Sequence, residues 1–265
     1  MNLIKEYKGE IILAVGLFLV PFIIPSFGVS TDVGTLVTAT STIFAVVAGF
    51  FIVDVTSNYL RLQTLIAEED AALISIADDA QQVDGNNYVG VHEAIDAYMI
   101  AQLDLGTLDH FEQTQKQIDR LDASIHALLV QPEGSVIYDH ILALEEKIIS
   151  CRQEMTLAAK KTLSLLHWLT LIALAALVVI TVLAIRDGYW FTNVVASSMM
   201  VGILAVLVLL RDIDNNSILE NKLGYKNSTQ VFHAISKPPY YPYFSAIKSR
   251  IPDKAGRLRV GEKTN

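Results

Sequence analysis

Long apolar blocks alternate with polar stretches along the chain, with two blocks near the N-terminus and two between about residues 163 and 210. A bilayer core about 30 Å thick requires about 20 helical residues at about 1.5 Å each. Four segments have that length: Glu10–Val29, Val33–Val55, Leu163–Ile185 and Trp190–Leu210. Because the links within each pair are very short and backbone polar groups in lipid must be paired within helices, each pair is predicted to form an antiparallel hairpin.

The first apolar segment follows Lys5 and Lys8, as the apolar part of a secretory signal peptide would. A cleavable signal ends in a small-x-small site, whereas this segment ends among Pro21, Pro25 and Gly28. We therefore predict a retained span that is kinked at its prolines.

Basic residues fall almost entirely on one side of the predicted spans. Of the 20 Lys and Arg residues, all but Arg186 lie before the first span, between the second and third, or after the fourth. The positive-inside rule makes that side cytoplasmic. We expect a multi-pass protein of the cytoplasmic (bacterial inner) membrane, with both termini and the middle domain in the cytoplasm.

The polar stretch between the hairpins, residues 56–162, has the pattern of a helical domain. Turn-forming clusters divide it at 84–87 (Asp-Gly-Asn-Asn) and 131–134 (Gln-Pro-Glu-Gly). Elsewhere apolar residues recur at steps of three and four, which is typical of helices packed on helices.

This periodicity also runs into the predicted spans. After Gly134 it continues to Leu165 without a proline or glycine, so we expect one long helix to enter the third span from the middle domain. A similar continuity is expected out of the second span through Tyr59 and Leu62.

The sequence thus predicts an all-α integral membrane protein in four parts. These are a transmembrane hairpin (1–55), a cytoplasmic helical domain (56–162), a second transmembrane hairpin (163–210) and a basic cytoplasmic tail (211–265). The helical domain holds 18 acidic and 7 basic residues, net −11, and the tail 5 acidic and 10 basic, net +5. Either these are ordinary solvated faces, or the tail docks on acidic domains or anionic lipid. Its segment 237–243 (Lys-Pro-Pro-Tyr-Tyr-Pro-Tyr) is expected to be extended over a partner surface.

A stripe of small or hydroxylated residues at steps of four and three marks the second span. Its members are Thr31, Thr35, Thr38, Thr42, Ala45 and Gly49. One explanation is close packing of helices through small residues, with threonines bonding to their own backbone. The other is a water-filled path lined by several copies of this span, in which hydroxyls ease ion dehydration.

Other residues of the span fit the second explanation. Phe44, Phe50 or Phe51 could form an apolar constriction. A ring of Asp54 near the cytoplasmic end would attract cations, unless this carboxylate is simply hydrated at the interface.

Glu69 occupies a position on the helical seam where an apolar residue is expected. A buried acid requires a partner, so we expect pairing with Arg or Lys, or a wet cavity. Together with Glu68 and Asp70 it is also a weak candidate for a divalent-cation site between subunits.

The sequence offers little for catalysis or cofactors. The single cysteine, Cys151, excludes an internal disulfide and a multi-cysteine zinc site. No P-loop, Gly-rich dinucleotide turn or nucleophile elbow is present. We expect neither an enzyme nor a cofactor-binding protein, and no nucleic-acid partner.

Several local features resemble the bestrophin-like bacterial membrane proteins, a family of unknown function distantly similar to bestrophin channels. They are the two hairpins around a helical domain, the stretch Arg61…Glu68-Glu69, Arg211-Asp-Ile-Asp-Asn, and the tail segment 231–242. The resemblance implies a ring-shaped homo-oligomer, a pentamer in bestrophins, with the second span lining an ion path. Bestrophins have an acidic calcium clasp that cannot be placed here and a more aromatic neck, so anion selectivity and calcium gating do not carry over.

The sequence leaves two candidate functions. One is a homo-oligomeric channel for an inorganic ion, with the second span around the axis in the lipid bilayer. The other is a non-conducting membrane scaffold or sensor whose acidic helical domain binds a cytoplasmic partner.

Overall fold

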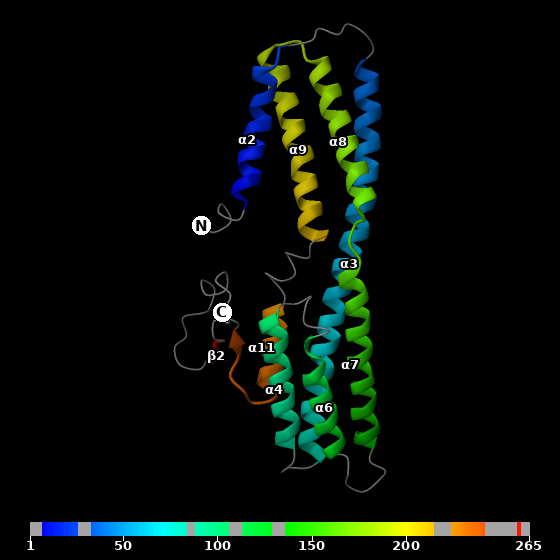
Figure 1. Cartoon of the computed structure of the whole chain (residues 1–265), viewed down its shortest axis with the longest axis vertical. Helices are drawn as coiled ribbons and strands as arrows, with labels where there is room; N and C mark the ends of the chain where they lie inside the picture. The colour runs from blue at the N-terminus through cyan, green and yellow to red at the C-terminus, as the bar shows by residue number, and fades with distance from the viewer. Residues whose placement is uncertain are drawn as a thin grey trace. The chain divides into compact units, whose positions relative to one another are not determined.

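The computed structural model describes residues 7–25, 33–83, 88–105, 113–128, 136–214, 224–241 and 259–260. Within these ranges the chain is almost entirely helical (Figure 1). It divides into two compact units, here called the apolar unit (1–57 with 162–215) and the polar unit (58–161 with 216–265). Helix α3 (Val33–Val83) contributes to both units, so the predicted continuity of the second span with the helix after it is confirmed.

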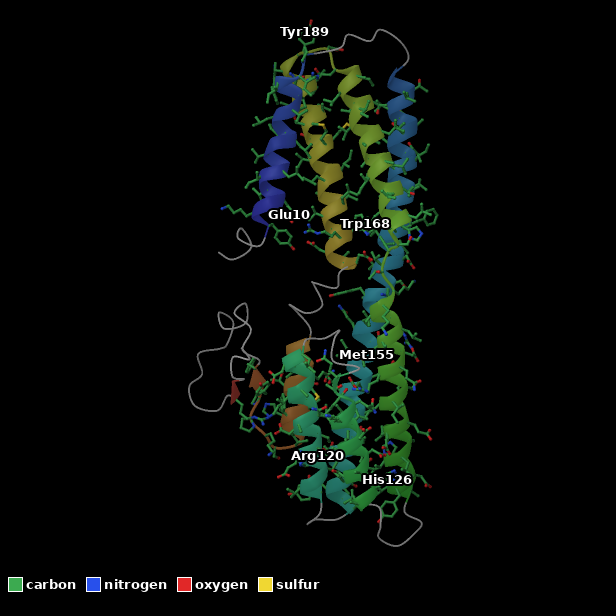
Figure 2. All side chains as sticks on the ribbon, viewed as in Figure 1. Glu10, Arg120, His126, Met155, Trp168 and Tyr189 are labelled. Atoms are coloured by element: carbon green, nitrogen blue, oxygen red, sulfur yellow. The ribbon has the colours of Figure 1, made fainter. Side chains whose placement is uncertain are left out.

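The apolar unit consists of α2 (Lys8–Ile23), the first part of α3, α8 (Leu165–Ile185) and α9 (Trp190–Asp214). Its buried core joins α3 to α8 and α9, and the hydroxyl oxygens of Thr40 and Thr181 lie 3.4 Å apart at the α3–α8 contact. Helix α2 packs on α9, where the Ser197 hydroxyl donates to the Phe18 carbonyl at 2.7 Å. In Figure 2, Tyr189 lies at the end where α8 turns into α9, and Glu10 and Trp168 lie toward the other end of this unit.

Three of the described helices are long and apolar enough to cross a membrane: α3 over 34–83, α8 and α9. Helix α2, at 16 residues, is shorter than the predicted Glu10–Val29 span. The helix ends because Ile24, with ψ 131°, is extended, as expected for a residue before proline, here Pro25.

The expectation of one continuous helix into the third span is wrong. Helix α7 (Val136–Lys160) ends before 161–164, which are not helical, and α8 begins after the N-cap residue Ser164. The Ser164 side chain accepts a hydrogen bond from the His167 N–H, and the His167 side chain accepts one from the Ser164 N–H. Asp214 on α9 stabilises this break. Its carboxylate accepts a hydrogen bond from the Leu163 N–H at 2.8 Å and another from Trp168 Nε1 at 3.3 Å. These side-chain caps replace the helical bonds that would have carried α7 into α8.

The polar unit packs the second part of α3 against α4 (Tyr88–Leu105), α6 (Gln115–Leu128), α7 and α11 (Gly224–Ala234). The buried core contains members of all five helices, including Leu73, Ile95, Ile125, Ile148 and Phe232. The sequence predicted no break between α4 and α6, yet they are separate helices that pack on each other. The breaks predicted at 84–87 and 131–134 lie outside the described residues.

Part of the basic tail folds onto the polar unit of its own chain. Strands β1 (Tyr240–Tyr241) and β2 (Arg259–Val260) pair in parallel, and the Tyr240 hydroxyl donates to Asp104 at 2.7 Å. The Arg259 guanidinium donates two hydrogen bonds to the Asp96 carboxylate, at 2.7 and 2.6 Å, and lies over the Phe232 ring. A basic tail residue thus docks on an acidic helix within one chain.

Candidate functional site

Helix α3 has two contrasting sides within the apolar unit. Thr40, Phe44, Ala48 and Val55 are buried at 3–7% exposure and pack against the rest of the unit. Steps of four, four and seven place these residues on one side of a helix with about 3.6 residues per turn. The opposite side of the helix is left uncovered by the chain's own described residues.

The small-residue stripe lies on that uncovered side. Thr35, Thr38, Thr42 and Ala45 are exposed, and Gly49 is half-buried. Thr31 lies outside the described residues. The stripe is therefore not a contact surface for other described helices of the same chain.

Two threonines of the stripe bond back to the helix. Thr38 Oγ1 donates to the Gly34 carbonyl at 3.0 Å, and Thr42 Oγ1 donates to the Thr38 carbonyl at 2.7 Å. A hydroxyl has one hydrogen to donate and two acceptor lone pairs. Since the hydrogen is used within the helix, the oxygen lone pairs remain available to water or to a cation.

The three phenylalanines considered for a constriction differ in burial. Phe44 is buried in the core of the apolar unit and Phe51 is half-buried with its ring centroid 5.0 Å from that of His167, so both belong to the covered side. Phe50 is 73% exposed. The placement of Phe44 and Phe51 does not fit a constriction on the same side as the stripe, and Phe50 alone remains available for one.

Asp54 is exposed on α3. Twelve residues beyond Thr42, it lies about 120° around the helix from the stripe at about 100° per residue. A carboxylate there can influence ions near the end of the stripe, but it does not continue the stripe itself.

A buried polar network surrounds Glu69 in the polar unit. Glu69 is fully buried and accepts hydrogen bonds from the Tyr98 hydroxyl and, at 3.2 Å, from Gln102 Nε2. Arg152 Nη1 donates to the Tyr98 oxygen at 2.7 Å and to Thr114 Oγ1 at 3.1 Å. The network joins α3, α4 and α7. Among the described residues, Glu69 accepts its hydrogen bonds from Tyr98 and Gln102 rather than from an arginine or lysine, and Tyr98 links it to Arg152. Burial raises the pKa of Glu69, while the Tyr98 hydrogen bond and the Arg152 charge act in the opposite direction.

The three acids Glu68, Glu69 and Asp70 do not converge on one point. Glu68 pairs with Lys147 at 2.5 Å on α7, whereas Glu69 belongs to the Tyr98 network. Asp70 is buried, and desolvation, with the neighbouring Glu69 charge, raises its pKa well above the usual range. The structure therefore does not support a cation site made of these three residues within one chain.

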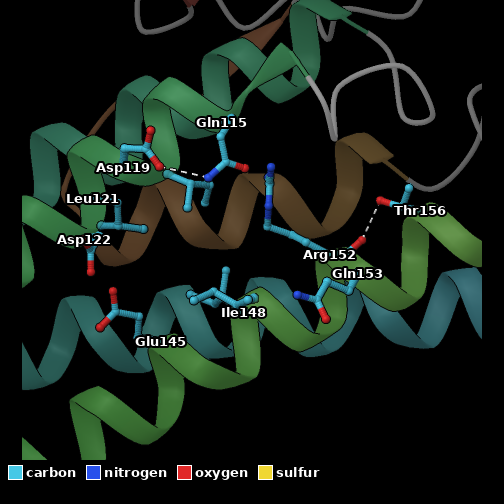
Figure 3. Close-up of a pocket in the computed structure, with 11 residues that line it drawn as sticks. Gln115, Asp119, Leu121, Asp122, Glu145, Ile148, Arg152, Gln153 and Thr156 are labelled. Carbon is cyan, nitrogen blue, oxygen red and sulfur yellow. Dashed lines mark hydrogen bonds between the residues drawn. The ribbon is translucent and has the colours of Figure 1, made fainter.

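A different group brings three potential metal ligands close together. Asp122, His126 and Glu145 each place one ligand atom within 4.8 Å of the others, beside a pocket of about 400 Å³ between α6 and α7. Figure 3 shows the carboxylates of Asp122 and Glu145 turned toward each other. Burial raises the pKa of Glu145 to about 7, and the hydrogen bond with Asp122 and the charge of Asp122 contribute to the same shift. Imidazole and carboxylate groups could hold a divalent cation here. The sequence signal, Asp122 four residues before His126 on a helix, was missed.

The long apolar helices define the chain as an all-α membrane protein. Residues 12–215 match the bestrophin-like domain family, so the chain belongs to that family and the resemblance seen in the sequence is confirmed. A solved crystal structure, described only as that of a membrane protein, is similar, with a TM-score of 0.68 and 13% identity over 87% of this chain and 98% of that one. At that identity the likeness shows the fold alone. No curated protein matches the chain.

Proposed function

We propose that this chain is a homo-oligomeric ion channel, not an enzyme, in which the stripe of α3 lines the pore. The observation that carries the proposal is the uncovered stripe. Thr35, Thr38 and Thr42 are exposed, while the other side of the same helix is packed. The hydroxyl oxygens of Thr38 and Thr42 keep lone pairs that water or a cation can use, so a water-filled axis suits this side of the helix better than lipid does.

Membership of a family that includes ion channels supports this function. A single copy presents only one pore-lining helix, so a conducting path requires several copies around an axis. We propose a ring, with five subunits as the first candidate, because the family resemblance implies a pentamer.

Four spans complete the proposed topology. Helix α2 is the first span, followed by α3, α8 and α9, with both termini and the polar unit in the cytoplasm. The positions of 19 of the 20 basic residues support this orientation. In this orientation, ions that leave the pore on the cytoplasmic side would meet the acidic polar unit.

The decisive experiment compares two adjacent positions on α3. Thr42 lies on the stripe, whereas Ile43, 52% exposed, lies about 100° around the helix. Wild-type protein in liposomes is expected to dissipate an ion gradient. Thr42→Trp is expected to abolish the flux, while Ile43→Trp retains it. Mass photometry or native mass spectrometry checks that both variants assemble.

Equal flux in the two variants would remove the stripe from the pore. Absence of flux in the assembled wild-type protein would instead favour the scaffold function. That alternative further requires a complex with a cytoplasmic protein that is lost when residues 88–130 are deleted.

A further inference from the structure

Arg186 is the one basic residue in the short links, and it lies between α8 and α9 with only 3% of its surface exposed. Its Nη2 donates to the carbonyls of Ile24 and Pro25, the latter at 3.0 Å. Among the described residues, Nε and Nη1 have no hydrogen-bond partner. A guanidinium has five N–H donors, so three of them are buried and unused.

An unpaired buried charge of this kind is costly, and it points to a ligand. Arg186 lines a pocket of about 240 Å³ within the apolar unit. Most of the remaining wall is apolar, formed by residues such as Val37, Val182, Phe191, Val195 and Met199. The pocket therefore offers a positively charged side chain beside a surface that suits hydrocarbon.

The surroundings correspond to the headgroup level of a bilayer. Tyr189, Trp190 and Phe191 follow Arg186 and are 63–73% exposed. Exposed aromatic residues at the end of an apolar helix are typical of the membrane–water interface. Asp187, the other charged residue on the pocket wall, is exposed and makes no hydrogen bond with Nε or Nη1 of Arg186.

We infer that this pocket binds an anionic phospholipid, whose phosphodiester pairs with the Arg186 guanidinium and whose acyl chain lies along the Val195–Met199 side of α9. A soluble phosphate would satisfy the guanidinium but would leave the apolar wall uncovered. The wall therefore assigns the ligand to the lipid. This site is independent of the proposed pore, which uses the stripe of α3.

The test is native mass spectrometry of the delipidated full chain titrated with phosphatidylglycerol. Arg186→Gln is expected to weaken binding of the first lipid about tenfold, as expected for loss of charge-assisted hydrogen bonds. Arg186→Lys retains the charge and part of the affinity. Val195→Trp keeps the arginine but fills the pocket from an exposed position of α9, so it is also expected to weaken lipid binding. It provides the test of the pocket if Arg186→Gln does not fold.

Arg211→Gln, at the other end of α9, is the control for loss of one positive charge and is expected to bind as wild type. Glycerol phosphate and inorganic phosphate form the soluble arm and are expected to give no adduct at the same concentrations. Wild-type affinity in both Arg186→Gln and Val195→Trp would overturn the proposal. Binding of soluble phosphate that matches phosphatidylglycerol would overturn the lipid assignment.

Discussion

Tyr98 and Glu69, on the neighbouring helices α4 and α3, share a hydrogen bond at a place where both residues are fully buried. The phenol donates a hydrogen bond to the carboxylate and accepts one from Arg152, so one hydroxyl links an acidic side chain to a basic one. Tyr98→Phe removes both bonds. We expect a loss of about 1–3 kcal/mol in the free energy of unfolding, measured by urea titration in detergent, because two buried hydrogen bonds are lost while Glu69 keeps the Gln102 hydrogen bond and Arg152 the Thr114 one.

Tyr88→Phe is the matched control for that measurement. Tyr88 is also on α4 and half-buried, and no described residue bonds to its hydroxyl. Its loss is expected to change the unfolding free energy by less than about 0.5 kcal/mol. Equal effects of the two substitutions would mean that the network contributes no more than packing.

Glu145 predicts a pH dependence of stability. Its pKa is raised from 4.5 to about 7 in the folded protein, chiefly by burial and by Asp122. A raised pKa means that the folded state binds this proton more tightly than the unfolded state. Stability from this group is therefore full below about pH 4.5 and is lost as pH rises to about 7. Glu145→Gln should raise the melting temperature at pH 8 and leave it unchanged near pH 4.5.

Asp139 provides the control, because Asp139→Asn removes an exposed carboxylate from the same helix α7 and Asp139 is not among the groups that raise the pKa of Glu145. We expect its effect on the melting temperature to vary less between the two pH values. A Glu145→Gln effect that is the same at pH 8 and pH 4.5 would contradict the assignment.

The effect of the hydroxyl groups of the stripe on ion flux can be tested apart from the effect of side-chain size. Thr38→Val and Thr42→Val keep a branched side chain of similar size but remove the oxygen. If the lone pairs ease ion dehydration, liposome flux should fall in each variant and further in the double variant, with assembly unchanged. Thr64→Val, an exposed threonine of α3 in the polar unit that also bonds to its own helix, should retain full flux.

The bidentate contact between Arg259 and Asp96 fastens β2 to the polar unit. Arg259→Ala is expected to speed hydrogen–deuterium exchange at β1 and β2, because the charge-assisted pair on α4 is lost. Lys237→Ala removes only a 4.0 Å contact with the same carboxylate and should have a smaller effect. Unchanged exchange in Arg259→Ala would show that the strands are held by other contacts.

The apolar pattern was sufficient for the long helices, since hydrophobic periodicity directly reflects burial or lipid exposure. It failed at 161–164, where the apolar repeat continues while Ser164 and Asp214 cap the chain. That cap depends on a residue of another helix, which a local pattern does not contain. For the same reason Glu69 could be recognised as needing a partner, but Tyr98 and Arg152 could not be named.

The phenylalanines illustrate the same limit. Phe44, Phe50 and Phe51 are equally apolar and close in sequence, and only the packed core of the apolar unit shows that Phe44 is covered and Phe50 is not. The Asp122–His126–Glu145 group combines a local spacing with a residue from a neighbouring helix. Such a combination becomes visible only when the helices are placed together.

The acid on the seam of α3 also has a consequence for specificity. An apolar seam built of leucine and isoleucine can slide by a turn and still bury similar surface. Such a slide would separate Glu69 from the Tyr98 phenol and leave charges stranded in the interior. The network therefore selects a single register among α3, α4 and α7 and penalises every shifted alignment, at some cost in stability.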